Sequence, residues 1–157
     1  KESELHKLCA ELGSDLNVCL KGGCLLATSR GEKTEKLPNI SMAVSLIKPK
    51  NLGISAKEAY TRYAQKEFKP KNNYTEKMAE ALNLKHDIRP FLYNDLEYAV
   101  FDDYKELQYI KQVLPSSIMS GSGSTYFVLD NLETSLNDDF QIINNLEFIS
   151  GGVEQID

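Results

Sequence analysis

The most constraining feature of this 157-residue sequence is a stretch near its end in which four small residues separate two apolar runs. The stretch reads SSIMSGSGSTYFVLD, and its middle, Gly121 to Ser124, carries no side chain larger than a hydroxymethyl group. The apolar flanks predict strands at 116–120 and 125–129. The loop between them has two interpretations that the motif alone does not separate. It is either a tight hairpin turn that needs positive φ, or a loop whose backbone N–H groups converge on an anion.

Strand-like patterns dominate the first third of the chain, helical patterns the middle, and both kinds mix at the end. We predict strands at 16–20, 24–29, 33–38, 40–49 and 146–150, and helices at 3–12, 56–68, 75–82, 90–101, 102–114 and 133–145. The helix at 56–68 begins with a capping box, in which Ser55 is followed by Glu58 three residues later. The predicted fold class is α+β, with an antiparallel sheet packed with helices.

Composition excludes several functions. The net charge of −5 argues against nucleic-acid binding, which needs a basic face. No apolar run is long enough for a membrane span. Cys9, Cys19 and Cys24 are odd in number and lack C-x-x-C spacing, which favours reduced thiols in a cytosol over a disulfide framework or a zinc site. His6 and His86 have no companion ligands, so we expect no metal site in this chain.

Two polar stretches are candidates for chemistry, each with a plain structural alternative. Asp15 follows a predicted helix stop, where it is either a general base or a turn residue that bonds its own backbone. Asn94 and Asp95 lie inside the helical pattern at 90–101, although Asn and Asp are poor formers of helix interiors. Either these side chains have a function, or they form a solvated face of the helix together with Glu97.

Four segments occur in an order and spacing that resemble the 4-diphosphocytidyl-2-C-methyl-D-erythritol kinase family of the GHMP kinase superfamily. They read ELGSDLNVCLKGGCLLATSRGEKTEKLP, IKPKNLGISAKEAY, NDLE and MSGSGST, the last resembling the third superfamily motif. The resemblance covers nearly the whole chain. It implies that residues 1–40 are the remainder of an N-terminal kinase domain and that residues 41–157 form the C-terminal domain.

The resemblance also implies the activity, the cofactor and the site. The reaction would transfer the γ-phosphoryl group of ATP, with Mg²⁺, to the 2-hydroxyl of 4-diphosphocytidyl-2-C-methyl-D-erythritol in the non-mevalonate (MEP) isoprenoid pathway. The implied residues are Asp15 as the catalytic base, Ser55 and Tyr60 at the substrate, and Gly121, Ser122, Gly123 and Ser124 as the loop beside the phosphate. Ala56 departs from the family pattern at a substrate contact, and Asn17, Val18 and Cys19 depart from it at the pocket wall.

The family's lysine-bearing first motif and its glycine-rich ATP-phosphate motif do not occur in this sequence. We therefore expect the chain to be the C-terminal portion of the enzyme and inactive by itself, in a bacterial cytoplasm or a plastid-type organelle. Apolar strands left uncovered would make a homodimer plausible. The alternatives are another GHMP kinase, of the homoserine or mevalonate type, and a non-catalytic binding module.

Overall fold

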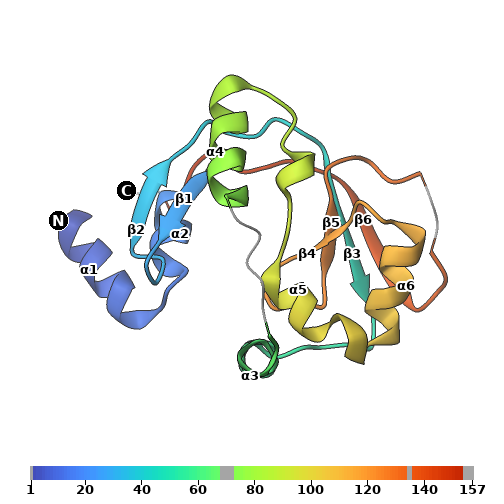
Figure 1. Ribbon diagram of the computed structural model, residues 1–157. Helices are drawn as coiled ribbons and strands as arrows, with labels where there is room; N and C mark the ends of the chain where they lie inside the picture. Colours follow the sequence, from blue (N-terminus) through green and yellow to red (C-terminus); the bar gives the residue numbers. More distant parts are fainter. Residues whose placement is uncertain (1, 68–72, 134–135, 154–157) are drawn as a thin grey trace. The chain divides into compact units, whose positions relative to one another are not determined.

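A computed structural model describes residues 2–67, 73–133 and 136–153 of the chain (Figure 1). Its contacts divide the chain into two compact units, each of which is described by itself. The first comprises Lys1–Ser41, Thr75–Ile88 and Phe148–Asp157, and the second Met42–Tyr74 and Arg89–Glu147. Helices combine with strands that pair only in the antiparallel sense within the described ranges, which confirms the predicted α+β class.

The first unit contains a two-stranded hairpin and short helices. Its elements are α1 (Glu2–Leu12), α2 (Leu16–Lys21), β1 (Leu25–Thr28), β2 (Lys33–Lys36) and most of α4 (Tyr74–Leu84). Gly22, at φ +60°, ends α2 where the chain's last described residues pass close by. A Cβ atom there would come within 2.0 Å of the Gly151 carbonyl oxygen, so only glycine fits.

The second unit is a four-stranded sheet with helices packed against it. Its elements are β3 (Val44–Pro49), α3 (Ala56–Gln65), α5 (Asp95–Val100), α6 (Lys105–Val113), β4 (Ile118–Met119), β5 (Tyr126–Val128) and β6 (Phe140–Leu146), with 3-10 turns at Arg89–Phe91 and Phe101–Asp103. The strand order is β4-β5-β3-β6. One buried cluster joins the sheet to the helices, with Ile47, Met119 and Tyr126 from the strands and Ala59, Val100, Leu107 and Ile110 from the helices.

The strand predicted at 16–20 is wrong, because these residues form α2. Asn17 is buried, while Leu16 before it and Cys19 two residues after it are exposed. That spacing follows the turn of a helix rather than the alternation of a strand. The amide of Cys19 donates to the carbonyl of Asp15, so the helical ladder begins at once. A short apolar run does not distinguish the two structures by pattern alone.

The helix predicted at 133–145 is also wrong where the structure describes it, since residues 140–146 form β6. β6 pairs with β3, and Ile142 lies opposite Ile47. β-branched side chains suit this pleated position, and the pairing satisfies backbone groups along β3 that would otherwise be an open edge. The predicted last strand at 146–150 is reduced to Leu146, the end of β6. Residues 134–135 lie outside the described ranges.

The continuous helix predicted at 90–101 is divided. A 3-10 turn at Arg89–Phe91 is followed by extended backbone, and α5 begins only at Asp95. Asn94 is not in a helix interior: with φ −144° and ψ 118° it is the N-cap of α5. Asp102 and Asp103, at which the helix predicted at 102–114 begins, lie in a second 3-10 turn, and Tyr104 precedes α6.

The remaining predicted elements are confirmed with shifted ends, and Phe68, the expected end of the helix after Ser55, lies outside the described residues. No disulfide joins Cys9, Cys19 and Cys24. In the described part of the chain no helix combines the length and apolar character that a bilayer crossing requires.

The buried hydroxyl group of Tyr126 allows a test of how polar groups in the core affect stability. Its side chain is fully buried, and its hydroxyl has no hydrogen-bond partner of ordinary geometry among the described residues, although burial and nearby Glu97 raise its pKa. Removing a buried, unsatisfied hydroxyl relieves a desolvation cost, so Tyr126→Phe should raise the free energy of unfolding by about 1 kcal/mol in urea denaturation.

Tyr104→Phe is the matched control, because the Tyr104 hydroxyl bonds to the carboxylate of Glu58. That change should lower the free energy of unfolding. A loss of stability in Tyr126→Phe equal to that of the control would show that the Tyr126 hydroxyl is satisfied.

Candidate functional site

Two loops of the second unit meet at one end of its sheet. β3 runs antiparallel to β5, with Ile47 opposite Tyr126, so the end of β3 lies beside the start of β5. The loop that leaves β3, residues 50–55, ends at Ser55, and the loop that enters β5 is Gly121 to Ser124. The Ser124 hydroxyl donates to the carbonyl of Leu52 at 2.6 Å. The structure thus brings together two of the stretches that the sequence singled out.

The four residues of the glycine-rich loop, Gly121 to Ser124, divide into an outer and an inner pair. The inner pair is packed: a Cβ atom on Gly123 would lie 2.6 Å from the Met119 sulfur, and Ser124 is fully buried. In the outer pair, Gly121 is exposed and a Cβ atom on it would meet nothing within 4 Å, while Ser122 is half-buried. Positive φ angles of +56° at Gly121 and +88° at Gly123 confirm the tight turn.

The backbone donors of the loop divide in the same way. The Gly123 amide donates to the carbonyl of Ser120 at 3.0 Å and closes the turn. The amides of Gly121 and Ser122 make no hydrogen bond to any of the described residues. Two unengaged N–H groups at an open tip are the feature that an anion-binding loop requires.

One side chain, that of Asn94, connects the glycine-rich loop to α5. Its Oδ1 atom accepts from the amide of Leu96 at 2.9 Å and caps the helix. Its Nδ2 group donates to the carbonyls of Met119 at 2.7 Å and Gly121 at 2.8 Å. A single amide therefore starts the helix and fixes both the end of β4 and the outer residue of the loop.

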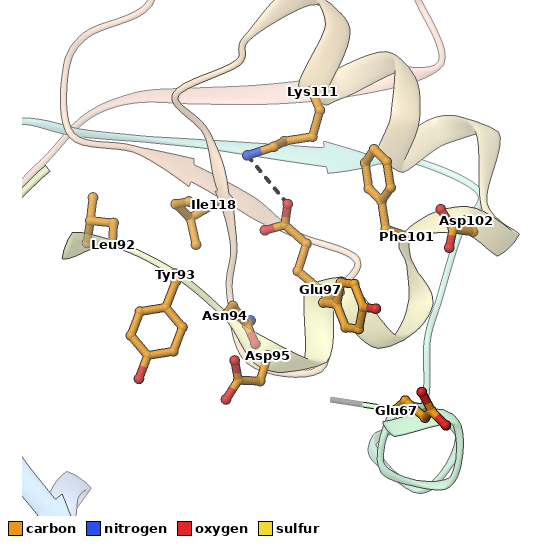
Figure 2. A pocket seen from close by; sticks show the side chains of 11 residues that line it. Glu67, Leu92, Tyr93, Asn94, Asp95, Glu97, Phe101, Asp102, Lys111 and Ile118 are labelled. Atoms are coloured by element: carbon orange, nitrogen blue, oxygen red, sulfur yellow. Dashed lines mark ion pairs between the residues drawn. The ribbon is translucent and has the colours of Figure 1, made fainter. Parts of the chain in front are cut away.

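Glu97, one turn along α5, holds the same strand. Its Oε2 atom accepts from the Met119 amide at 2.8 Å, and its Oε1 atom lies 3.5 Å from the Lys111 ammonium group (Figure 2). Lys111 also donates to the carbonyl of Ser117 at 2.5 Å. The NDLE motif and the MSGSGST motif are consequently parts of one hydrogen-bonded assembly.

A pocket of about 700 Å³ opens beside this assembly (Figure 2). Its lining residues are Glu67, Leu92, Tyr93, Asn94, Asp95, Glu97, Tyr98, Phe101, Asp102, Lys111 and Ile118. Four of them are acidic and one is a lysine, so the wall does not attract phosphate. Asn94 is the residue that both lines the pocket and holds Gly121.

Of the residues predicted to contact the substrate, Ser55 is the N-cap of α3 and Tyr60 lies on that helix. The Ser55 hydroxyl accepts from the Glu58 amide at 3.1 Å, which confirms the predicted N-cap. The side chain of Tyr60 is 60% exposed and is available to a ligand. Neither residue lines the 700 Å³ pocket.

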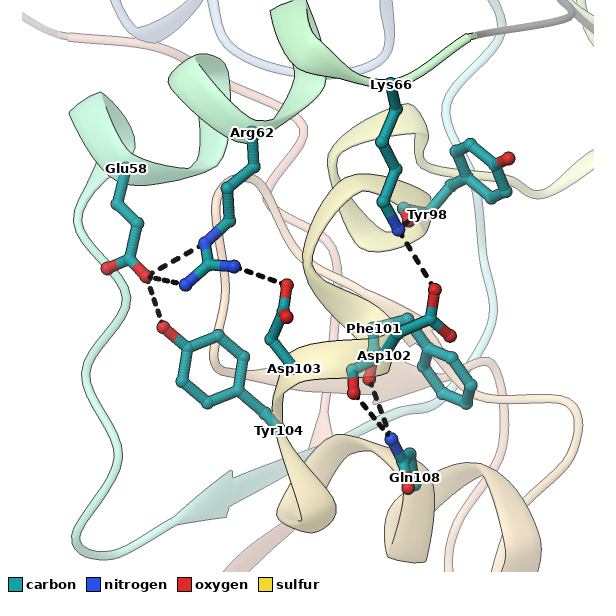
Figure 3. A network of polar contacts seen from close by, with 9 residues as sticks. All are labelled: Glu58, Arg62, Lys66, Tyr98, Phe101, Asp102, Asp103, Tyr104 and Gln108. Carbon is teal, nitrogen blue, oxygen red and sulfur yellow. Dashed lines mark hydrogen bonds and ion pairs between the residues drawn. The ribbon is translucent and has the colours of Figure 1, made fainter.

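A polar network fixes α3 against the turn before α6 (Figure 3). The Glu58 carboxylate accepts from the Tyr104 hydroxyl and from Arg62, whose Nε atom lies 3.1 Å away, and Arg62 also bonds to Asp103. These bonds, first that of Tyr104 and then that of Arg62, lower the pKa of Glu58, and the Glu58 carboxylate raises the pKa values of Tyr104 and Arg62. Lys66 extends the network to Asp102 at 3.0 Å.

Asp15 belongs to the first unit, at the N-cap position of α2. Its side chain is exposed and makes no capping hydrogen bond, whereas buried Asn17 lies 2.7 Å from the ring nitrogen of His6. The capping hydrogen bond to the nearby backbone, which the turn interpretation of Asp15 expects, is therefore not formed. Because Asp15 and the glycine-rich loop lie in different units, their meeting in one pocket stays a prediction.

Comparisons of the sequence and of the fold with known proteins point to the same family of kinases. No protein-family model matches the chain. A protein of Caldanaerobacter subterraneus subsp. tengcongensis named 4-diphosphocytidyl-2-C-methyl-D-erythritol kinase is 39% identical over 141 residues, covering 84% of this chain and 48% of that protein. A Carboxydothermus hydrogenoformans protein of the same name is 35% identical over 140 residues, covering 84% and 49%. The chain spans about half the length of the curated relatives it matches.

The fold agrees. A crystal structure of 4-(cytidine 5'-diphospho)-2C-methyl-D-erythritol kinase superposes with a TM-score of 0.62 and 28% identity, covering 80% of this chain and 47% of that one. The chain has the fold of the C-terminal part of a GHMP kinase. Within that class, it is related by sequence and by fold to the C-terminal part of the 4-diphosphocytidyl-2-C-methyl-D-erythritol kinases.

The sequence did not reveal the roles of Asn94 and Glu97 as anchors of the glycine-rich loop. One signal was available: Asn followed by Asp is a better helix start than a helix interior. The contacts with Met119 had no signal, because they join residues more than twenty positions apart.

Replacing the amide of Asn94 should release the loop. Asn94→Asp keeps an acceptor for the cap, but it removes both donors and directs a carboxylate at two carbonyl groups. We expect a loss of about 1–3 kcal/mol in the free energy of unfolding, measured by urea denaturation. Asn83→Asp is the control, because Asn83 is exposed and donates to one helical carbonyl. It should change stability by less than about 0.5 kcal/mol. Equal stabilities of the two variants would contradict the anchoring role.

Proposed function

We propose that the complete protein containing this chain phosphorylates the 2-hydroxyl group of 4-diphosphocytidyl-2-C-methyl-D-erythritol with ATP, in the non-mevalonate route to isoprenoids. The observation that carries the proposal is the 39% identity over 84% of the chain with a kinase of that name. The open tip of the glycine-rich loop supports it, since phosphoryl transfer depends on positioned donors more than on covalent chemistry.

In this proposal Asp15 is the catalytic base. It would accept the proton of the substrate hydroxyl as that oxygen attacks the γ-phosphorus of ATP and ADP leaves. An exposed carboxylate that caps no helix is available for this task. The proposal also assigns residues 1–40 to the remainder of the N-terminal kinase domain and residues 41–157 to the C-terminal domain.

The glycine-rich loop would lie beside the transferred phosphate. Its outer pair, Gly121 and Ser122, has the two unengaged amides, whereas Gly123 and Ser124 shape the turn from within. Ser55 and Tyr60 would contact the substrate, with the exposed Tyr60 ring offering a stacking face for a base.

ATP would bring Mg²⁺ to the site. Among the described residues there is no group of three or more His, Cys, Asp or Glu side chains that could hold a metal, so the ion would be bound through the phosphate groups of the nucleotide. The complete enzyme would act in a bacterial cytoplasm or a plastid-type organelle, and a homodimer is the proposed assembly.

Two other functions compete with this proposal. Another GHMP kinase, such as a homoserine or mevalonate kinase, would prefer a substrate without cytidine. A binding module would bind its ligand without releasing ADP. The identities of 39% and 35% with kinases named for the cytidylated substrate favour the first proposal over both.

The role of Asp15 is tested by Asp15→Asn in the complete protein. Removing a general base should lower kcat by about 10²–10⁴-fold while the protein remains folded, measured as ADP release with the cytidylated substrate. Glu11→Gln, which changes another exposed acid of the first unit, is the control and should retain activity. Near-normal turnover by Asp15→Asn would refute the assignment.

The 157-residue chain itself should release no ADP above background. Its sequence lacks the glycine-rich segment that holds ATP phosphates in this family, so the nucleotide has no cradle in this chain. The measurement compares the chain and the complete protein at equal concentration under saturating ATP. Substrate-dependent ADP release by the chain alone would contradict this prediction.

A further inference from the structure

Lys48 occupies an unusual position at the end of β3. Its ammonium group donates to the carbonyl of Leu52 at 2.7 Å and to the hydroxyl of Ser124 at 2.5 Å. Leu52 lies in the loop that leads to Ser55, and Ser124 ends the glycine-rich loop. One half-buried cation therefore touches both loops of the candidate site.

The bonds form a closed triangle. The Ser124 hydroxyl uses its proton on the carbonyl of Leu52 at 2.6 Å, and its oxygen accepts from Lys48. Since that hydroxyl is buried and its proton is used, the side chain of Ser124 has no donor left for a ligand. Its position serves to connect Lys48 and Leu52 to the loop.

The charge of Lys48 is not balanced within the part of the chain that the structure describes. Neither of its hydrogen-bond partners carries a charge, and no described carboxylate forms an ion pair with it. Lysine is seldom withdrawn from water without an acidic partner. Lys48 lies on the less buried face of β3, as Leu46 does, and its ammonium group is bonded to the two loops rather than to an acidic side chain.

We propose that Lys48 is a positioning residue for phosphoryl transfer, which ties the 50–55 loop to the glycine-rich loop and holds a positive charge behind it. This inference rests on the proposed function. The tie fixes Ser55 relative to the amides of Gly121 and Ser122, because both loops are bonded to one ammonium group. The uncompensated charge makes this end of the sheet favourable to the negative charge of a phosphate.

The test uses the complete protein and four variants of these two positions. Lys48→Met removes the charge and both bonds, Lys48→Gln keeps a donor without the charge, and Ser124→Ala removes the connecting hydroxyl. The double variant Lys48→Met with Ser124→Ala measures their coupling. Lys85→Met is the control, because Lys85 is an exposed lysine after α4, outside both loops, whose side chain makes no hydrogen bond or ion pair with the described residues.

Lys48→Met should lower kcat for ADP release by about 10–100-fold, with less than about 3-fold change in KM for either substrate, and Lys85→Met should leave both unchanged. The loss in the double variant should be close to that of Lys48→Met alone, because both changes break one connection. Lys48→Gln should retain more activity than Lys48→Met. Multiplicative losses, or a normal kcat in Lys48→Met, would overturn the inference.

Amide hydrogen exchange separates this inference from the proposed function. In Lys48→Met, amides at 51–55 and at 121–125 should exchange faster together, and in Lys85→Met they should not. Unchanged exchange refutes the tie whatever the activity. If the wild-type protein releases no ADP with the cytidylated substrate, the proposed function fails and the catalytic role of Lys48 fails with it, while faster exchange would still establish the connection between the loops.

Discussion

The amide of Asn94 is the contact on which the second unit's site depends. A loop of two glycines and two serines has almost no side-chain surface with which to hold its own conformation, and glycine adds backbone entropy that must be overcome. Asn94 supplies the missing order from outside, because its two donors reach Met119 and Gly121 while its oxygen begins α5. The start of α5 and the conformation of the loop are therefore coupled, because the same side chain bonds to both.

The sheet provides the second constraint, which is topological. Antiparallel pairing of β3 with β5 places the exit of one strand beside the entrance of the other. The loops at 50–55 and 121–124, which are about seventy positions apart in the sequence, thus become neighbours. The strand pairing alone brings them together, before any contact between the loops is made. Side chains then refine what the pairing began, as Ser124 bonds to Leu52 and the missing Cβ of Gly123 lets Ile54 and Met119 approach.

Prediction from sequence succeeded where local chemistry decides the structure. The Ser55 cap, the strands around the glycine-rich loop and the turn itself all followed from residues within a few positions of one another. Prediction failed at 16–20, where a short apolar run fits either a helix or a strand, and at 133–145, where a distant partner decides. β6 forms because β3 offers it an edge, which no window of sequence contains. For the site, the motifs were visible singly, but the bonds from α5 to β4 were not.

The residue types at the two anchors follow from what each must donate. Position 94 must accept one hydrogen bond for the helix cap and give two to carbonyl groups, and the amide of asparagine has that combination, whereas aspartate and serine do not. Glu97 takes the opposite part, since the Met119 amide needs an acceptor. The backbone of Met119 is thus held at both its N–H and its C=O by residues three positions apart on α5, one turn of helix. These bonds attach the two-residue strand β4 to the start of α5. The helix thereby restrains the glycine-rich loop, which has few side-chain contacts of its own.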